Sequence, residues 1–258
     1  MAFATSGEAS IYYEVHGDGP CVVFAHGRGG NAASWWQQVP AFAGSYKVIV
    51  FDHRCFGRSR CPSDAFDREK FDRDLIAVLD AEGIEQAAIV CQSMGGWTGL
   101  RTALRHPDRV RCLVLSNTPG GVDTPGVRNA LRQAREDFHR RGVGAAAVAE
   151  DFGSRAPEAA FLYRQIGSLN LQIPEALGHG GEGWVSPDAL QALRLPVLVI
   201  SSEHDQIFPP AAIREVAGLI PDADYVELPM AGHSPYFETP DRFNETIAPF
   251  LERHCRDG

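Results

Sequence analysis

The sequence predicts an α/β protein, in which a sheet is covered by helices on both faces and a helical insertion divides the chain. Two observations predict this fold class. Short apolar runs bounded by turn residues alternate with longer amphipathic segments, which is typical of strands and helices that follow one another. The alternation stops near residue 118 and resumes near residue 187, with only helical patterns between. At 258 residues, the chain is long enough for one large domain with a well-buried core.

The first half of the chain contains segments with the length and composition of strands. They span residues 10–16, 21–26, 47–52, 87–91 and 110–116. Between them, residues 67–82 place apolar side chains at helical spacing, and residues 94–105 predict a second helix. That helix ends before His106-Pro107, because a proline disfavours helical geometry in the residue before it.

The segment after residue 118 has no strand patterns, and glycine and proline cluster at both of its ends. The helices predicted within it span residues 127–141, 144–152 and 157–169. The elements that resume the first pattern are strands at residues 196–201 and 225–228 and a helix at residues 240–253. We therefore expect a core made of residues 1–118 and 185–258, with residues 119–184 inserted into it.

The composition excludes several classes of protein. Hydrophobic residues at 44% and charged residues at 22% are ordinary for a soluble globular chain. The formal charge of -9 disfavours nucleic acid and anionic membranes as partners, because both require a basic face. No apolar run approaches the roughly 18 residues of a membrane helix. The N-terminus lacks a basic start and a long apolar core, so no signal peptide is expected.

The cysteines favour a reduced, cytoplasmic and metal-free protein. Cys21, Cys91 and Cys112 lie in apolar runs, where a cysteine behaves as a small hydrophobic residue. Cys55 and Cys61 flank a loop and are close enough in sequence to pair, although we expect them to be reduced. No cysteine spacing resembles a metal site, so no metal or cofactor is predicted. The oligomeric state, including a homo-oligomer, stays open.

The most informative motif is a serine between small residues at the end of an apolar run. Ser93 follows residues 88–92, and a helical pattern starts directly after it. Such a turn presents a hydroxyl away from its own backbone, and small residues at Cys91 and Gly95 allow its tight geometry. Cys91 stands where the G-x-S-x-G pattern usually has glycine. Alone, the motif is equally typical of an ordinary strand–turn–helix corner.

Partners for this serine follow other strand-like runs. Upstream, an apolar run ends in His26-Gly27 and a glycine-rich loop. Downstream, Asp205 lies just beyond the predicted strand at 196–201, and His233 follows the last predicted strand. The chain order nucleophile, acid, histidine is one of those known for a Ser-His-Asp triad.

Five motifs lie in a fixed order along the chain: His26-Gly27, Asp52-x-Arg54-x-x-Gly57-x-Ser59, Gln92-Ser93-Met94-Gly95-Gly96, Asp205 and Gly232-His233-Ser234. Through these motifs, and over almost its whole length, the chain resembles the α/β-hydrolase fold family. The resemblance implies a mostly parallel, twisted sheet flanked by helices. It also implies that residues 119–184 form a helical cap over the active site, the alternative being helical padding on the outer face.

Ser93 is the predicted nucleophile, which needs a base within hydrogen-bond reach. His233 is the best candidate for that base, ahead of His26, His106 and His204. Asp205 is the predicted acid that orients the imidazole. Glu203 remains an alternative acid, whereas Asn117 carries no charge and Asp52 is interpreted as structural support.

The oxyanion hole is expected to use two backbone N–H groups. One belongs to Met94, directly after the nucleophile, and the other to Arg28, in the loop after His26-Gly27. The glycine-rich loop is not a phosphate cradle, because it lacks both a Gly-Lys-Ser/Thr ending and the G-x-G-x-x-G spacing. The side chain of Arg28 either reaches a substrate carboxylate or is solvated.

Aromatic residues near these motifs are candidates for the walls of a substrate pocket. We predict that Trp97, Phe138 and Trp184 contact the substrate. Core packing is the alternative for these and for the other aromatic residues of the region, namely Trp35, Trp36, Phe152 and Phe161. So many apolar groups fit a small, uncharged and moderately hydrophobic substrate better than a sugar or nucleotide.

These expectations define a serine hydrolase that cleaves a carboxylic ester or lactone through an acyl-enzyme on Ser93, without a cofactor. Three alternatives stay open. C–C bond hydrolases of ring-cleavage pathways share the serine triad and a helical cap. Perhydrolase and haloperoxidase-like members of the family share the triad, and some proteins of this fold are non-enzymatic ligand receptors. Dehalogenases and epoxide hydrolases are disfavoured because they use aspartate at the position of Ser93. The fold itself cannot choose the substrate.

Overall fold

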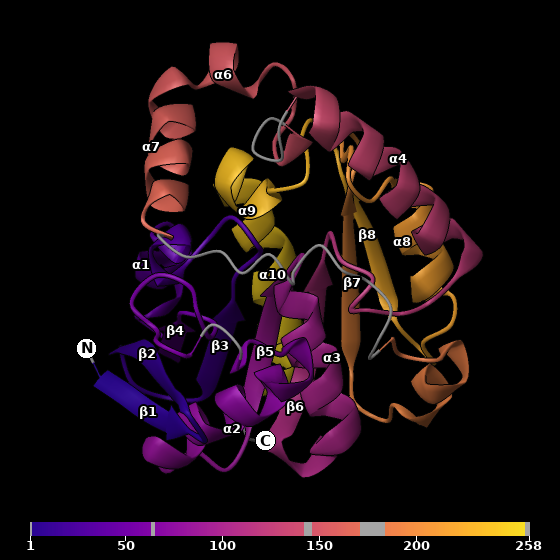
Figure 1. Ribbon diagram of the computed structural model, residues 1–258. Helices are drawn as coiled ribbons and strands as arrows, with labels where there is room; N and C mark the ends of the chain where they lie inside the picture. Colours follow the sequence, from indigo (N-terminus) through magenta and orange to yellow (C-terminus); the bar gives the residue numbers. More distant parts are fainter. Residues whose placement is uncertain (1, 63–64, 142–145, 171–183, 256–258) are drawn as a thin grey trace.

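The computed structural model describes residues 2–62, 65–141, 146–170 and 184–255, apart from the side chains at 135 and 137–141 (Figure 1). Its strands form one sheet in the order β1-β2-β4-β3-β5-β6-β7-β8. β2 pairs antiparallel with β1 and β4, and all other neighbours are parallel. The strands are β1 (Ala2–Ser6), β2 (Ala9–His16), β3 (Cys21–Ala25), β4 (Lys47–Phe51), β5 (Ala87–Gln92), β6 (Val110–Ser116), β7 (Val197–Ser202) and β8 (Asp224–Leu228). The α/β fold class is confirmed.

The strand β1 was not expected from the sequence. It lies at the edge of the sheet and pairs only with β2, to which it connects through Gly7 at φ +58°. Phe3 is 57% exposed, and the rest of the strand consists of small or hydroxyl-bearing residues. An edge strand of this kind buries little apolar surface and therefore lacks the hydrophobic run by which the inner strands were predicted.

Helices cover both faces of the sheet, and each face has its own apolar core (Figure 1). α2 (Phe71–Ala81), α3 (Gly95–Arg105) and α8 (Pro210–Ala217) contribute to one core, and α1 (Gln38–Phe42) and α10 (Pro240–Cys255) to the other. None of the helices in the described ranges is long and apolar enough to cross a membrane.

The central parallel strands are mostly apolar because both of their faces are buried. In β3, Val22 and Phe24 belong to one core, whereas Val23 and Ala25 belong to the other. All four side chains are 0% exposed, which is the burial expected of a parallel strand between two helical layers. Because β3, β5, β6 and β7 run parallel to one another, their carboxyl ends meet at one edge of the sheet.

Between β6 and β7 the chain leaves the sheet and forms α4 (Pro125–Arg141), α6 (Phe152–Arg155) and α7 (Pro157–Ser168). Figure 1 shows these helices arching over one end of the sheet, with α4 beside α8. The helix predicted over residues 144–152 is interrupted, because residue 146 is helical and α6 begins at Phe152, but residues 147–151 are not helical. Residues 147–151 form turns, because the Ala149 N–H donates to the Glu238 carboxylate instead of a helical carbonyl, while residues 144 and 145 lie outside the described part.

Cys55 and Cys61 form a disulfide, with their Cα atoms 5.5 Å apart. The expectation of reduced cysteines is therefore wrong for this pair. The loop between them folds back on itself because Ser10 and Arg60 exchange backbone hydrogen bonds of 2.9 Å, which fixes one end of the loop against β2. Cys21, Cys91, Cys112 and Cys255 are free and buried.

Candidate active site

Ser93 occupies the sharp turn between β5 and α3. Its φ of +51° lies in the left-handed region, which residues other than glycine adopt at an energetic cost. Two donors hold its carbonyl oxygen, the Gly96 N–H at 2.9 Å and the Thr118 hydroxyl at 2.5 Å. Gly95 allows α3 to approach β3, because a Cβ at this position would overlap the carbonyl oxygen of Ala25. The turn presents Ser93 to a cavity.

Gly99 of α3 leaves room for Cys91, the cysteine that departs from the usual motif. Cys91 is fully buried in β5, and a Cβ at Gly99 of α3 would collide with its sulfur. The larger side chain on the strand therefore fills the space that the helix leaves open, and the turn keeps its geometry. Burial raises the pKa of the Cys91 thiol, so this thiol stays neutral and unreactive.

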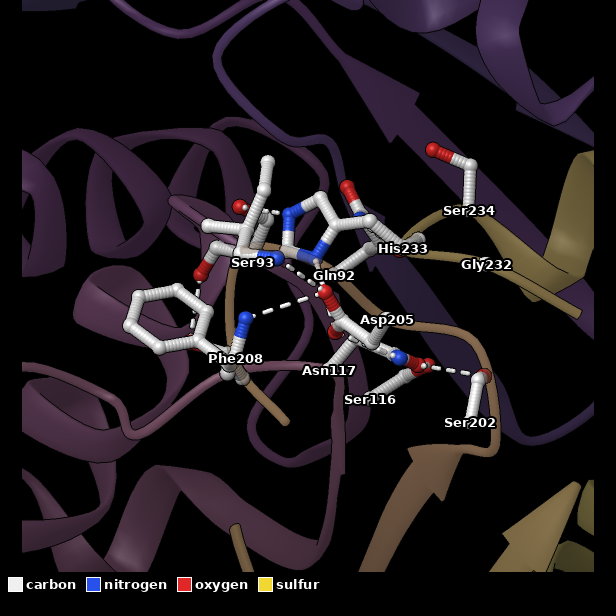
Figure 2. Close-up of polar contacts among 12 residues, drawn as sticks. Gln92, Ser93, Ser116, Asn117, Ser202, Asp205, Phe208, Gly232, His233 and Ser234 are labelled. Carbon is white, nitrogen blue, oxygen red and sulfur yellow. Dashed lines mark hydrogen bonds and ion pairs between the residues drawn. The ribbon is translucent and has the colours of Figure 1, made fainter. Parts of the chain in front are cut away.

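Ser93, His233 and Asp205 lie together in one hydrogen-bonded chain (Figure 2). His233 Nε2 is 2.7 Å from Ser93 Oγ, and His233 Nδ1 is 2.9 Å from Asp205 Oδ2. A carboxylate only accepts hydrogen bonds, so we place the imidazole hydrogen on Nδ1. Nε2 is then free to accept the hydroxyl hydrogen of Ser93, which is the geometry of a Ser-His-Asp triad.

The carboxylate of Asp205 is buried and fully engaged. Its Oδ1 accepts the backbone N–H groups of Ile207 and Phe208 at 2.8 and 2.9 Å, and its Oδ2 accepts the side-chain amide of Asn117 at 2.9 Å (Figure 2). These donors stabilise the ionised carboxylate inside the protein and fix its direction toward His233. The sequence excludes Asn117 as the acid but carries no signal for this supporting role.

Two buried polar side chains hold the backbone on either side of His233. Gln92 donates from Nε2 to the His233 carbonyl at 2.8 Å. Glu238, in α9 (Pro235–Glu238), accepts the N–H groups of Gly232 and Ser234 at 3.0–3.2 Å. Burial raises the pKa of Glu238, although these N–H groups act in the opposite direction. Sequence reasoning missed Glu238, for which Ser234-Pro235 at a helix start was the available signal.

The loop that follows β3 is held by His26. His26 Nδ1 lies 2.7 Å from the Gly27 carbonyl oxygen, and His26 Nε2 accepts the His53 N–H at 3.0 Å. Complete burial lowers the pKa of His26 to about 4, so the ring is neutral, as this pair of contacts requires. His26 therefore has the structural role that the sequence suggested. Asn170, just after α7, donates to the carbonyls of Gly29 and Gly30 and holds the other side of the loop.

Arg28 and Met94, the residues expected to form the oxyanion hole, line the same cavity as Ser93 and His233. Among the described residues, neither backbone N–H donates to another protein atom. Both donors are thus available to a ligand.

Asp52 serves the turn that follows β4. Its two carboxylate oxygens accept the N–H groups of Ala32 and Arg58, each at 2.6 Å. Arg54 of the same turn makes a buried bidentate ion pair with Asp74 of α2. These contacts agree with the interpretation of the Asp-x-Arg-x-x-Gly motif as structural support.

The alternative acid and base lie away from the hydrogen-bonded chain. Glu203 and His204 are each 50% exposed at their side chains, and Glu203 accepts the N–H of Met230. His106 lies at the end of α3, 3.4 Å from Asp72. Glu203 as a substitute for Asp205 is therefore wrong.

The cavity beside Ser93 has a volume of about 470 Å³. Trp97 lines it, so its contact with the substrate stays a prediction, whereas Trp184 does not line it and packs against Trp97 with ring centroids 5.4 Å apart. The side chain of Phe138 lies outside the described part of the chain. The inserted segment contributes other residues to the lining: Leu131, Ala147, Tyr163, Arg164 and Gly167.

The other aromatic candidates do not line the cavity. Trp35 and Phe152 are core residues, whereas Trp36 and Phe161 are exposed. Within the described ranges, no three His, Cys, Asp or Glu side chains gather as a metal site.

A mostly parallel sheet with a Ser-His-Asp chain at its carboxyl edge defines a class of protein, the α/β hydrolases. Residues 20–240 match the family model described as alpha/beta hydrolase fold, and the chain belongs to this family. It is 30% identical to a protein of Azorhizobium caulinodans provisionally named carbamate hydrolase RutD, over 97% of this chain and 98% of that protein.

Two solved structures show the same similarity over nearly the whole chain. Est816, described as an N-acyl homoserine lactone degrading enzyme, is 28% identical with a TM-score of 0.85, covering 96% of this chain and 99% of that one. The enol-lactonase from Burkholderia xenovorans LB400 is 28% identical with a TM-score of 0.81, covering 97% of this chain and 99% of that one.

Proposed function

We propose that this hydrolase cleaves a carboxylic ester or lactone of a small, moderately hydrophobic substrate through an acyl-enzyme on Ser93. The observation that supports it most is the hydrogen-bonded chain from Ser93 Oγ through His233 to Asp205. A lactone is a cyclic ester, so one mechanism serves both substrates. The two lactone-cleaving relatives and the apolar residues Trp97, Leu131 and Phe208 around the cavity favour this substrate class.

In the acylation step, Ser93 Oγ attacks the carbonyl carbon while His233 Nε2 takes the hydroxyl proton. Asp205 holds the imidazole in place and stabilises its positive charge. The backbone N–H groups of Met94 and Arg28 donate to the oxyanion of the tetrahedral intermediate. Collapse of the intermediate breaks the C–O bond, and His233 gives its proton to the leaving alcohol. In a lactone, that alcohol stays attached to the acyl group.

In the deacylation step, a water molecule attacks the acyl carbon and His233 accepts its proton. The second tetrahedral intermediate uses the same oxyanion donors. When it collapses, the Ser93 oxygen leaves and recovers its proton from His233, so the enzyme returns to its initial state. The products are a carboxylic acid and an alcohol, or a hydroxy acid from a lactone.

We further propose that residues 119–184 act as a cap on the core formed by residues 1–118 and 185–258. Six residues of this segment, Pro119 and the five listed above, line the cavity in front of Ser93. A cap in this position limits the size of the acyl group and excludes bulk water during the reaction.

The nucleophile is tested by labelling with a fluorophosphonate, which reacts with activated serines. We expect stoichiometric labelling of the wild type and none of Ser93→Ala, with at least a 10⁴-fold lower kcat in the variant because the triad acts as a unit. Ser154→Ala is the matched control, since the exposed Ser154 hydroxyl only contacts the Asp151 carbonyl. Labelling that persists in Ser93→Ala would disprove the assignment.

The bond type is tested with a panel of p-nitrophenyl esters of rising chain length, a γ-lactone, a carbamate and a vinylogous 1,5-diketone. The proposal predicts the highest kcat/KM on an ester or the lactone. A preference for the diketone would identify C–C bond hydrolysis instead. Labelling at Ser93 without turnover of any member would support the receptor alternative.

A further inference from the structure

The cavity beside Ser93 has a cationic wall. The described residues that line it include Arg28, Arg68 and Arg164, and no aspartate or glutamate. The chain as a whole has a formal charge of -9, so this wall runs against the overall charge of the protein. A cavity lined by one sign of charge and by apolar side chains concentrates ligands of the opposite sign.

Arg28 lies in the loop after β3, directly next to Gly27. Its side chain is half-buried, and burial lowers the pKa of its guanidinium. No described carboxylate forms an ion pair with Arg28 or opposes this effect. Removing part of the hydration of a cation without supplying a counter-charge is unfavourable, and a bound anion would reverse that cost.

Arg68 lies close to Arg28 and stacks on the ring of Trp97, with the guanidinium carbon 4.3 Å from the ring centroid. Burial lowers the pKa of Arg68, the charges of Glu69 and Asp67 raise it, and the charge of Arg28 lowers it further. Glu69 is also engaged by the guanidinium of Arg101 at 2.6 Å. Arg28, Arg68 and Arg164 therefore place like charges around a cavity whose described lining contains no carboxylate, while Glu69 and Asp67 act on Arg68 from outside that lining.

We propose that Arg28 and Arg68, with the exposed Arg164 at the rim, bind a free carboxylate on the substrate. The physiological substrate is then an ester or lactone of a dicarboxylic acid. A guanidinium presents a planar fork that matches a carboxylate, and the stacking on Trp97 holds the fork of Arg68 in place. This inference rests on the proposed ester or lactone hydrolysis. It replaces the uncharged substrate expected from the sequence by an anionic one.

The carboxylate would anchor the end of the substrate that does not react. The apolar residues of the cavity would contact the carbon chain between the two ends, and the ester carbonyl would lie beside Ser93 Oγ. Anchoring at one end orients the carbonyl for attack, so the ion pair improves both binding and reaction.

The test compares p-nitrophenyl hydrogen glutarate with p-nitrophenyl pentanoate, which has the same chain length but no free carboxylate. We expect the wild type to prefer the anionic ester at least tenfold in kcat/KM, and Arg28→Gln and Arg68→Gln each to lower this preference about tenfold or more. Neither substitution removes a backbone N–H. Arg253→Gln is the matched control, because this exposed arginine lies in α10 and does not line the cavity.

A second measurement separates this inference from the proposed function. Calorimetry on Ser93→Ala is expected to show that p-nitrophenyl hydrogen glutarate binds more tightly than p-nitrophenyl pentanoate. Adding Arg28→Gln to this variant is expected to weaken the binding of p-nitrophenyl hydrogen glutarate. If the wild type hydrolyses both esters equally well, the anionic subsite is disproved while ester hydrolysis stands. If no ester or lactone is hydrolysed, the proposed function fails. The anionic subsite is then tested by calorimetry alone, through the difference in binding between the anionic and the neutral ester. If inorganic phosphate binds to Ser93→Ala as tightly as p-nitrophenyl hydrogen glutarate does, specific recognition of a carboxylate is contradicted.

Discussion

Asn117 is an uncharged side chain that holds the carboxylate of Asp205, the proposed acid of the site. Its amide donates to Asp205 Oδ2 at 2.9 Å, while its own oxygen accepts the hydroxyl of Ser116 at 3.0 Å. We expect Asn117→Ala to lower kcat about tenfold, because the variant loses one hydrogen bond to a buried charge and frees the carboxylate to rotate. Steady-state kinetics on the best ester of the panel measures this loss.

Ser202→Ala is the control for this prediction, since the Ser202 hydroxyl contacts the Asn117 oxygen at 3.3 Å but not Asp205. Its kcat should remain within about twofold of the wild type. A purely structural role for Asn117 would instead lower the melting temperature of Asn117→Ala and leave its kcat and pH profile unchanged.

At the scale of residues, the sequence predicted the three side chains of the hydrogen-bonded chain, each of which follows a strand. It did not predict the contact from Asn117 that holds one of them. Ser93, Asp205 and His233 each come after an apolar run, and the carboxyl ends of parallel strands meet at one edge, so their approach could be predicted locally. Asn117 and Asp205 are 88 positions apart, and no pattern near either residue signals their contact. Supporting hydrogen bonds of this kind depend on the finished tertiary structure.

The loop between β3 and η1 (Ala32–Trp35) depends on a neutral histidine and should therefore loosen in acid. Burial lowers the pKa of His26 from 6.5 to about 4. Between these two values the unfolded chain binds a proton that the folded chain does not, so stability falls as pH falls. From pH 7 to pH 5 the free energy of unfolding should decrease by about 2 kcal/mol through this residue.

Urea denaturation at the two pH values tests this effect in the wild type and in His26→Gln. The variant is expected to be less stable at pH 7 but to lose about 2 kcal/mol less on acidification. His204→Gln is the control, because the side chain of His204 is 50% exposed, and its pH dependence should match that of the wild type. Equal pH dependence in all three proteins would show that His26 does not control the acid response.

At the scale of elements, burial on both faces decided what could be predicted. β3, β5, β6 and β7 are mostly apolar because helices cover both of their sides, and the apolar runs in the sequence predicted these strands. β1 is an open edge and carried no such signal. The predicted helix over 144–152 failed for a different reason, since a tertiary hydrogen bond from Ala149 to Glu238 overrode the helical propensity of its alanines.

At the scale of the molecule, the inserted helices and the core meet at two polar joints near the site. Glu238 joins the Ala149 N–H to the loop that carries His233. Asn170 joins the end of α7 to the loop that carries Arg28. The sequence predicted an insertion between β6 and β7, but it could not show which side chains connect the insertion to the core. These connections link the position of the arch to the two loops that surround Ser93.

The joint at Asn170 gives the last prediction. Its amide nitrogen donates to the Gly29 and Gly30 carbonyls at 3.3 and 3.0 Å, and its oxygen accepts the Gly57 N–H at 2.9 Å. Asn170→Ala removes the side-chain partner of these three backbone groups, of which Gly30 is buried, Gly57 half-buried and Gly29 exposed. We expect the melting temperature to fall by about 3–8 °C and kcat/KM on neutral and anionic esters to fall at least tenfold, because the loop that carries Arg28, the proposed oxyanion donor, is no longer fixed.

The control is Ser168→Ala, two positions earlier, whose exposed hydroxyl contacts only the Gln165 carbonyl. Both its melting temperature and its kcat/KM should remain close to wild type. Asn170→Ala assayed well below its melting temperature separates the two effects of the joint. Reduced kcat/KM in a fully folded sample means that the end of α7 holds the oxyanion loop in its working geometry. Normal kcat/KM in the same sample would mean that Asn170 stabilises the fold and that the loop is positioned by His26 alone.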